Sequence, residues 1–366
     1  MNGGAARFAP PTQLNRGLLD HTLLDEQAVI AHLVQYCAGA GYAFPALLVL
    51  DYVVALKASP FVLLFGPSGQ GKTELARLCA EALVKPFDDQ YVYVNLGATN
   101  SEPFVHLQDR FGWLKFVEVL ETAADPGNAG RVFFLCLDNL RPADVVTYFA
   151  TVVHDADGNY RLAFRGYPPD RWPIVPPNVV ITGTLDADAP LDSEQSTLLA
   201  QVNGVYVQPQ WSQPTTITTS ATQRIAPVGF QRLLLNHTVR SEEMVAARLD
   251  ALLGDELDDV AQPPAELAAI MWGAGLTYNN VWRSAMLRSV ANSFTNAGQG
   301  LFIQYSVVQN AQFALVFALV RQMMLRLWGH PSHMQTLEAL LKQHINRFTP
   351  TNTPPHSPRH EALDEA

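Results

Sequence analysis

A run of glycines, a lysine and a threonine near the start of the chain has the spacing of a phosphate-binding loop. Within FVLLFGPSGQGKTELARLCAEAL, residues 61–83, Gly66 is followed by four residues and then by Gly71, Lys72 and Thr73. Glycines let backbone N–H groups approach a phosphate closely, and a helix that follows adds the positive end of its dipole. We predict that this loop binds a nucleotide, ATP or GTP, through Gly66, Pro67, Ser68, Gly69, Gln70, Gly71, Lys72, Thr73 and Glu74.

Two side chains of this loop have separate expected roles. Lys72 can reach the β- and γ-phosphates, and the Thr73 hydroxyl can coordinate Mg²⁺. The alternative is a glycine-rich turn that holds a lysine by chance. The apolar segment before the loop and the Ala/Leu-rich segment after it match the strand and the helix that the motif requires, so they favour nucleotide binding.

A second candidate is Asp138, which closes the apolar run in RVFFLCLDNL, residues 131–140. Open α/β sheets bind their ligands at the carboxyl ends of the strands, where an aspartate can support a metal ion. Many buried strands end in aspartate only to cap the next segment. Combined with the loop, Asp138 predicts a Mg²⁺ site formed by Thr73 and Asp138.

An α/β domain must position these side chains. Near-continuous apolar runs that alternate with helical patterns are typical of a parallel sheet covered on both faces. The expected strands are 61–65, 91–95, 132–137, 179–183 and 205–208. The expected helices lie within 26–57 and at 73–84, 114–124 and 143–153. The predicted fold class is therefore α/β, a parallel P-loop sheet flanked by helices and followed by a C-terminal helical lid domain.

The chain divides into five predicted regions. A Pro/Thr/Gln-rich stretch indicates a linker, and after it the patterns are only helical. The longest helical pattern, 306–328, repeats apolar residues near one face: Val308, Ala311, Leu315, Leu319 and Met323. The regions are an N-terminal arm at 1–25, a nucleotide-binding domain at 26–210, the linker at 211–228, a helical lid domain at 229–347 and a disordered tail at 348–366.

Composition excludes several classes of protein. Apolar residues make up 48% of the chain and charged residues 16%, a globular balance. The net charge of -10 and the lack of a long basic run argue against strong intrinsic nucleic-acid binding. We expect neither a secretion signal nor a membrane span. Cys37, Cys79 and Cys136 are expected to be buried free thiols in a cytoplasmic protein, and the histidines and cysteines lack zinc-ligand spacing.

Taken together, SPFVLLFGPSGQGKTELARLCAEAL, FLCLDN and PPNVVITGTLDAD resemble segments of the AAA+ nucleotidases, and within them of the McrB-like branch of restriction motors. The resemblance covers residues 45–210, and the later helices are only generically similar to an AAA+ lid. It implies a homo-oligomeric ring, commonly a hexamer, or a hetero-oligomer, with the nucleotide between subunits. It also implies a nuclease or another effector as partner, and a setting in bacterial defence of the anti-phage or restriction type.

The same resemblance places Asp138, Asn139 and Asp186 in the catalytic part of the site, with departures from the family pattern. Asn139 stands where the family has a glutamate that polarises the attacking water, and an amide cannot act as that base. Asp186 stands where the family has a polar sensor, and its charge would repel the γ-phosphate. The stretch TLLAQVNGV, residues 197–205, should contain an arginine for the neighbouring subunit, but Gln201 occupies the matched position.

Phosphoryl transfer depends on positioning and charge stabilisation, so these departures predict slow or partner-dependent hydrolysis. The alternative is a placement shifted by one or two residues, with Asp138 or Asp186 serving as the base. Two functions follow from these observations. The first is an AAA+ protein that couples nucleotide state to ring assembly or to a partner. The second is a non-hydrolysing regulatory or structural subunit that keeps nucleotide as a fixed ligand.

Two further groups of residues have alternative roles. Phe104, Phe111 and Trp113 follow the second expected strand, where ring motors carry substrate-gripping loops, but core packing is the favoured role for aromatic side chains. Arg321 and Arg326 either contact a phosphate from the lid or lie solvated on an amphipathic helix.

Overall fold

The computed structural model describes residues 25–83, 90–95, 112–141, 152–154, 160–162, 174–186, 202–208, 233–328 and 330–348. The predicted linker lies outside these ranges, as do the predicted arm up to residue 24 and the predicted tail from residue 349. Phe348, the first residue of the predicted tail, is the last residue of a helix.

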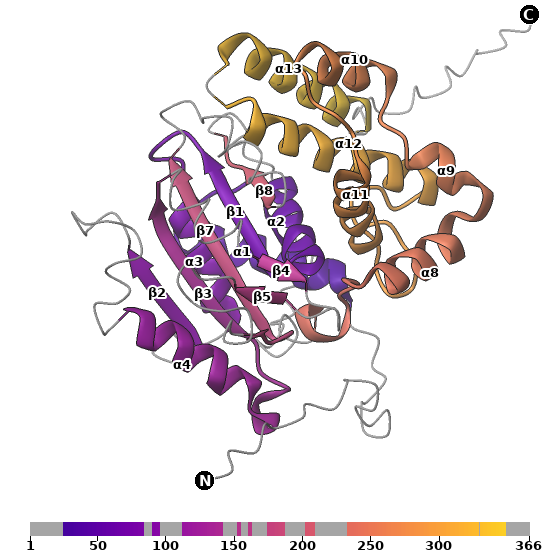
Figure 1. Ribbon diagram of the computed structural model, residues 1–366. Coiled ribbons are helices and arrows are strands. Elements are labelled where there is room, and N and C mark those ends of the chain that lie inside the picture. The colour runs from indigo at the N-terminus through magenta and orange to yellow at the C-terminus, as the bar shows by residue number, and fades with distance from the viewer. Residues whose placement is uncertain are drawn as a thin grey trace, which may run out of the picture.

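A five-stranded sheet forms the centre of the N-terminal part (Figure 1). All of its strand pairs are parallel, and the strand order is β2-β3-β7-β1-β8. The sheet and its flanking helices confirm the predicted α/β class, and each expected strand overlaps an observed one. The strands are β1 (Phe61–Gly66), β2 (Tyr91–Asn95), β3 (Phe133–Leu140), β7 (Val179–Asp186) and β8 (Asn203–Tyr206).

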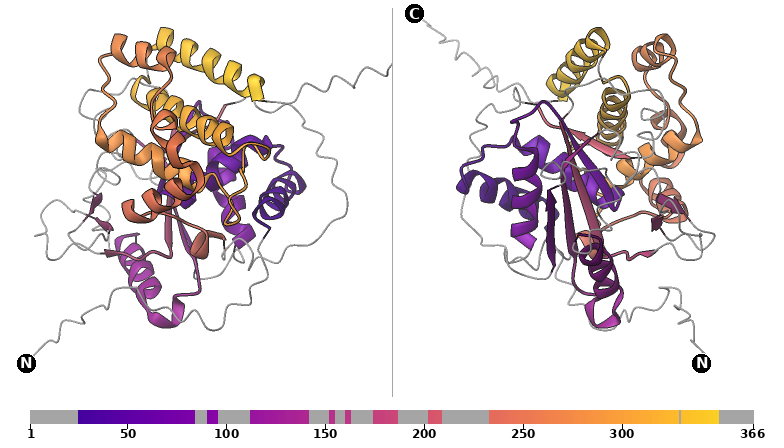
Figure 2. Two further views of the ribbon diagram at one scale, coloured as in Figure 1. Left: turned by 90° about the vertical axis from the view of Figure 1, so that its right-hand side faces the viewer. Right: turned by 60° about the vertical axis from the view of Figure 1, so that its left-hand side comes forward.

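Helices cover both faces of this sheet, as Figure 2 shows. Successive side chains of a strand point to opposite faces, so Phe61, Leu63 and Phe65 of β1 belong to one hydrophobic cluster, and Val62 and Leu64 belong to another. Helices α1 (Glu26–Gly39), α2 (Ala46–Ala58) and α3 (Lys72–Leu83) cover the face of Val62 and Leu64. Helix α4 (Gly112–Ala124) and the C-terminal helices cover the face of Phe61.

The C-terminal part that the structure describes is helical. Short polar side chains cap several of these helices, as Ser241, Asn279 and Ser306 each accept a backbone N–H of the first turn. The helices are α8 (Glu242–Leu253), α9 (Leu257–Val260), α10 (Ala265–Gly273), α11 (Asn280–Asn292), α12 (Val307–Arg326) and α13 (Pro331–Phe348), with short 3₁₀ turns at Gly254–Glu256 and, earlier in the chain, at Pro126–Asn128.

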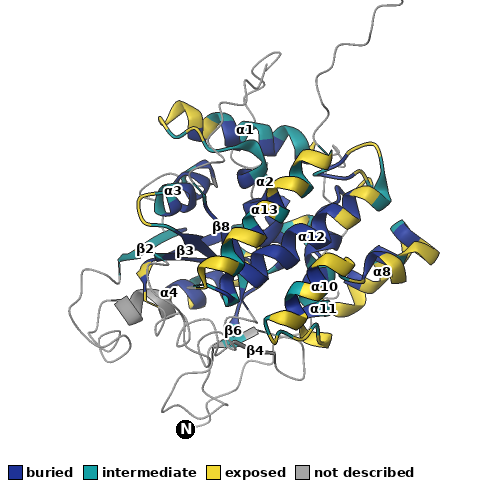
Figure 3. Ribbon diagram, turned by 90° about the horizontal axis from the view of Figure 1, so that it is seen from above, coloured by how far each residue is buried: buried dark blue, intermediate teal, exposed yellow. Residues whose placement is uncertain are grey.

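Helix α12 is the centre of this helical part. Its predicted apolar face lies in the core, but burial extends around the helix, because α11, α13 and β8 pack against it from different sides. Figure 3 shows α12 mostly in dark blue, with exposed yellow turns on the outer helices α8 and α10. Only Val308 of the predicted face is less than fully buried.

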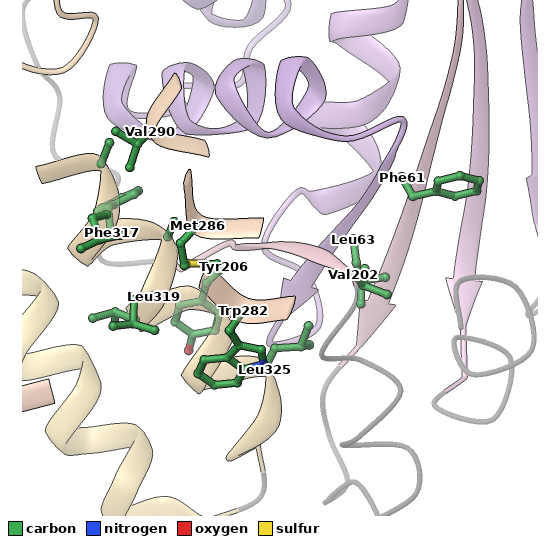
Figure 4. Packing of buried hydrophobic residues seen from close by; sticks show 14 of the residues in the cluster. Phe61, Leu63, Val202, Tyr206, Trp282, Met286, Val290, Phe317, Leu319 and Leu325 are labelled. Atoms are coloured by element: carbon green, nitrogen blue, oxygen red, sulfur yellow. The ribbon is translucent and has the colours of Figure 1, made fainter. Parts of the chain in front are cut away.

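Aromatic residues join the sheet to the helices. The rings of Phe65 and Tyr206 lie 5.2 Å apart, and Trp328 packs edge-on against both. Figure 4 shows the packing of this region, where Tyr206, Trp282, Met286 and Leu325 belong to the same hydrophobic cluster. This single hydrophobic cluster spans the predicted boundary between the two domains, and the division into domains stays a prediction.

A second, antiparallel sheet was not expected from the sequence. Strands β4 (Val152–His154), β5 (Tyr160–Leu162) and β6 (Ile174–Val175) pair in the order β4-β5-β6. The prediction of a helix at 143–153 is wrong for Val152 and Val153, whose β-branched side chains favour an extended backbone and which pair with β5. The rest of that predicted helix lies outside the described residues.

Two further expectations concern the cysteines and membranes. The three cysteines are buried and unpaired, as predicted. No helix in the described part of the chain is both long enough and apolar enough to cross a membrane.

Candidate phosphate-binding site

The loop between β1 and α3 has the backbone that its glycines permit. Gly66, Gly69 and Gly71 have φ angles of 147°, 76° and 81°, a region that L-residues rarely adopt. A Cβ atom on Gly66 would lie 2.4 Å from the carbonyl oxygen of Val207, and one on Gly71 would lie 3.0 Å from the Phe44 ring. At Gly69 no described atom lies within 4 Å of such a Cβ, so this part of the loop faces open space.

Lys72 is the first residue of α3, and its side chain is buried although it carries a charge. Its Nζ donates to the carbonyl oxygens of Gly66 at 3.0 Å and Pro67 at 2.6 Å. It also forms an ion pair with Asp186, the last residue of β7, at 2.7 Å. The Ser68 hydroxyl donates to the other oxygen of Asp186 at 2.9 Å. The structure therefore brings Lys72, Ser68 and Asp186 together.

Asp138 lies at the same edge of the sheet and is buried. One of its oxygens accepts hydrogen bonds from the Thr73 hydroxyl at 2.6 Å and the Thr184 hydroxyl at 2.5 Å. Its other oxygen accepts the Tyr93 hydroxyl at 2.7 Å. Although Tyr93 is 45% exposed, partial desolvation and the hydrogen bond to Asp138 raise the pKa of Tyr93, so Tyr93 stays a protonated donor. Thr73 and Asp138, the predicted metal ligands, are thus direct neighbours.

Asn139 occupies an unusual backbone position directly after Asp138. Its φ of 58° makes it the one described residue other than glycine with a positive φ. The pairing of β3 with β7 shifts register between Leu137 and Leu140, so Asn139 lies in a bulge. Its backbone N–H donates to Thr184, its amide donates to Asn95 at 3.1 Å, and its side chain is exposed.

Other predicted loop residues make less direct contributions. Pro67 contributes its carbonyl oxygen to Lys72, and the Gln70 amide lies 3.5 Å from the Ser68 carbonyl oxygen. Glu74 points along α3 to Arg77, whose Nε donates to it at 2.8 Å, so its contacts are with the helix and not with Lys72. These contacts separate Glu74 from the cluster around the lysine.

Sequence reasoning missed Tyr93 and Thr184. Both lie near the carboxyl ends of strands that neighbour β3, the strand that carries Asp138, and ligand groups gather at this end of a parallel sheet. Thr184 stands two residues before Asp186, and Tyr93 two residues before the end of β2. Polar residues at strand ends were the available signal, but only the strand order shows which of them meet Asp138.

Several predicted candidates lie elsewhere. Arg321 is buried and pairs with Asp51 of α2 at 2.7 Å, and Arg326 stacks over the Trp282 ring at 4.1 Å. The solvated alternative is wrong for Arg321, which is buried within the helical packing, whereas Arg326 is half-buried. Residues 197–201, including Gln201, lie outside the described residues, as do Phe104, Phe111 and the side chain of Trp113.

The arrangement can hold an anion and a hard cation side by side. A buried ammonium, backbone N–H groups at a helix N-terminus and a hydroxyl suit phosphate oxygens. Threonine and aspartate oxygens suit Mg²⁺. No group of three or more His, Cys, Asp or Glu side chains in the described residues could hold a metal by itself. The residues fit a Mg²⁺ ion that is completed by a bound phosphate, as nucleotide sites commonly are.

No protein-family model and no curated protein matches this chain.

Proposed function

We propose that the loop between β1 and α3 binds a nucleotide together with Mg²⁺. The nucleotide is ATP or GTP, or the corresponding diphosphate. The observation that carries the proposal is the position of Lys72. Its ammonium is buried beside a loop of three positive-φ glycines, one of which faces open space. A buried ammonium is unfavourable unless anionic or strongly polar partners compensate it, so a site that keeps one is suited to an anionic ligand.

The neighbouring residues support a role for Mg²⁺. Thr73 and Asp138 would hold the ion, because their oxygens already lie 2.6 Å apart at the end of β3. A bound Mg²⁺ would neutralise charge on the phosphates. Tyr93 and Thr184 donate to Asp138 and orient its carboxylate. Their role is therefore to position Asp138.

We further propose slow hydrolysis. The residue after Asp138 is Asn139, which has no carboxylate, and its side-chain amide donates a hydrogen bond to Asn95. Asp186 is engaged with Lys72 and Ser68. The resemblance to the McrB-like AAA+ branch extends this proposal to ring assembly and to an effector or nuclease partner in bacterial defence. The buried free thiols support a reducing, cytoplasmic setting.

The exposed amide at position 139 also favours the second candidate function, a regulatory or structural subunit that keeps nucleotide as a fixed ligand. A measurement of phosphate release separates the two candidates. Steady turnover supports a motor, whereas retention of an unhydrolysed nucleotide through purification supports a fixed ligand.

Substitution of Lys72 tests nucleotide binding itself. Lys72→Ala removes the ammonium, so we expect no binding of Mg-ATP or Mg-GTP by calorimetry and no thermal stabilisation by either nucleotide. The wild type should gain about 2.7 kcal/mol of stability at a ligand concentration of 100 Kd. Lys342→Ala is the control, because it removes a lysine of α13, far along the chain from the loop. Equal affinity of Lys72→Ala and the wild type would contradict the phosphate-binding loop.

A further inference from the structure

Asp186 lies beside the phosphate-binding loop. It is paired in register with Gly66, where β1 ends and the loop begins. One oxygen lies 2.7 Å from Lys72 Nζ, and the other accepts the Ser68 hydroxyl at 2.9 Å. The Asp186 side chain is 39% exposed, whereas that of Lys72 is 4% exposed. The carboxylate therefore closes the solvent side of the lysine.

The donors of Lys72 are fully engaged. An ammonium group has three N–H donors. In this structure two face the carbonyl oxygens of Gly66 and Pro67, and the third faces Asp186. A phosphate oxygen can reach Nζ only if one of these partners leaves. The two carbonyls belong to the loop backbone, whereas Asp186 is an exposed side chain that can rotate away.

The strand order places Asp186 next to the expected position of a terminal phosphate. Strand β7 lies between β1, which leads into the loop, and β3, which ends near Asp138. In P-loop nucleotidases the metal bridges the β- and γ-phosphates. A γ-phosphate held between the loop and Asp138 would lie beside the end of β7, where the Asp186 carboxylate repels it. A diphosphate lacks the group that meets this charge.

We propose that Asp186 is a built-in anionic competitor for the terminal phosphate and makes the site select a nucleoside diphosphate over the triphosphate. This inference rests on the proposed nucleotide binding. It assigns to Asp186 a specificity role in addition to its structural contact with Lys72. Displacement of Asp186, for example by a partner that binds it, would then be required for tight triphosphate binding.

The test replaces the carboxylate with an amide of the same shape. Calorimetry in the presence of Mg²⁺ measures the Kd of ADP and GDP and the Kd of non-hydrolysable analogues of ATP and GTP. Each Kd is measured for the wild type and for Asp186→Asn. We expect the wild type to bind the diphosphate about tenfold more tightly than the triphosphate analogue. In Asp186→Asn this preference should fall by about tenfold, mainly through tighter triphosphate binding.

Two further variants make the result specific. Glu118→Gln removes one negative charge from the exposed side of α4 and should keep the wild-type preference. Asp186→Ser removes the carboxylate with a smaller side chain and should behave as Asp186→Asn does, which protects the test if one variant folds poorly.

The outcomes distinguish this inference from the proposed function. An unchanged preference in both Asp186 variants, with binding still dependent on Lys72, would overturn the competitor role and leave nucleotide binding intact. If the Asp186 variants bind the diphosphate and the triphosphate analogue more tightly by the same factor, the proposed selectivity would be wrong. Failure of the wild type and of both Asp186 variants to bind any nucleotide would overturn the proposed function and this inference together.

Discussion

At the scale of single residues, Asn139 has two physical explanations. The resemblance to AAA+ proteins treats it as a lost water-polarising glutamate. The backbone offers a second reason, because its φ of 58° is a conformation that asparagine adopts more readily than most residues other than glycine. Both explanations can hold, and they predict different effects of substitution.

Asn139→Glu separates these explanations. Glutamate in the left-handed region should lower the free energy of unfolding by about 1 kcal/mol, whereas Asn139→Gly should change it by less. If position 139 faces the attacking water, Asn139→Glu should raise phosphate release or leave it unchanged. Urea denaturation and a phosphate-release assay measure the two effects. A slower release from a folded Asn139→Glu variant would contradict the proposed position of the base.

At the scale of elements, the strand that leads into the loop, β1, lies between two strands that are distant from it in sequence. β1 pairs with both β7 and β8, and the chain after β8 runs so close to Gly66 that a Cβ there would meet the Val207 carbonyl oxygen. The loop conformation therefore depends on the packing of β8 as well as on its own glycines.

Alanine substitutions in the loop test this dependence. Gly66→Ala combines backbone strain with a backbone clash, so we expect a loss of about 2 to 4 kcal/mol in the free energy of unfolding. Gly69→Ala meets no described atom and should lose only about 1 kcal/mol, from its positive φ. Equilibrium unfolding in urea compares the two variants. Similar losses at both positions would show that β8 does not constrain the loop.

At the scale of the whole molecule, buried charges join the N-terminal and C-terminal parts. Lys57 of α2 pairs with Glu26 at 2.9 Å, and His237 and the backbone N–H of Asn296 also contact Glu26. Asp51 and Arg321 form a buried ion pair at 2.7 Å. The Asp51–Arg321 pair joins α2 to α12, although desolvation offsets much of its energy.

The Asp51–Arg321 pair makes stability depend on pH. Burial raises the pKa of Asp51 to about 6, despite the opposing effect of Arg321. The folded state therefore binds a proton more tightly than the unfolded state, in which the carboxyl has its ordinary pKa of 3.8. The stabilisation from this proton is fully present below pH 3.8 and is lost as the pH rises through 6.

The double variant Asp51→Leu with Arg321→Met removes both charges. Relative to this variant, the wild type should lose free energy of unfolding as the pH rises from about 4 to about 7. Single substitution Asp51→Leu leaves Arg321 unpaired and should cost about 3 to 5 kcal/mol. Urea denaturation at each pH measures these differences. A constant difference between the wild type and the double variant across this pH range would contradict a raised pKa at Asp51.

The sequence alone determined the local features of this protein. Glycine spacing, apolar runs and helical periods depend on neighbours in the chain, so they predicted the loop at 66–74, the five parallel strands and α1 to α4. The expected metal pair, Thr73 and Asp138, came from the phosphate-loop motif and from the end of an apolar strand, and the structure places their oxygens 2.6 Å apart. The helical character of the C-terminal part followed from the same local signals.

Only the tertiary structure decided which distant side chains meet. Strand order and register bring Asp186 into an ion pair with Lys72. They also bring the Tyr93 and Thr184 hydroxyls into hydrogen bonds with Asp138, and each of these contacts joins residues 45 or more positions apart. Packing on several sides buries α12 and pairs Arg321 with Asp51. These contacts depend on how whole elements stack, and a residue's own neighbours in the chain carry little information about stacking.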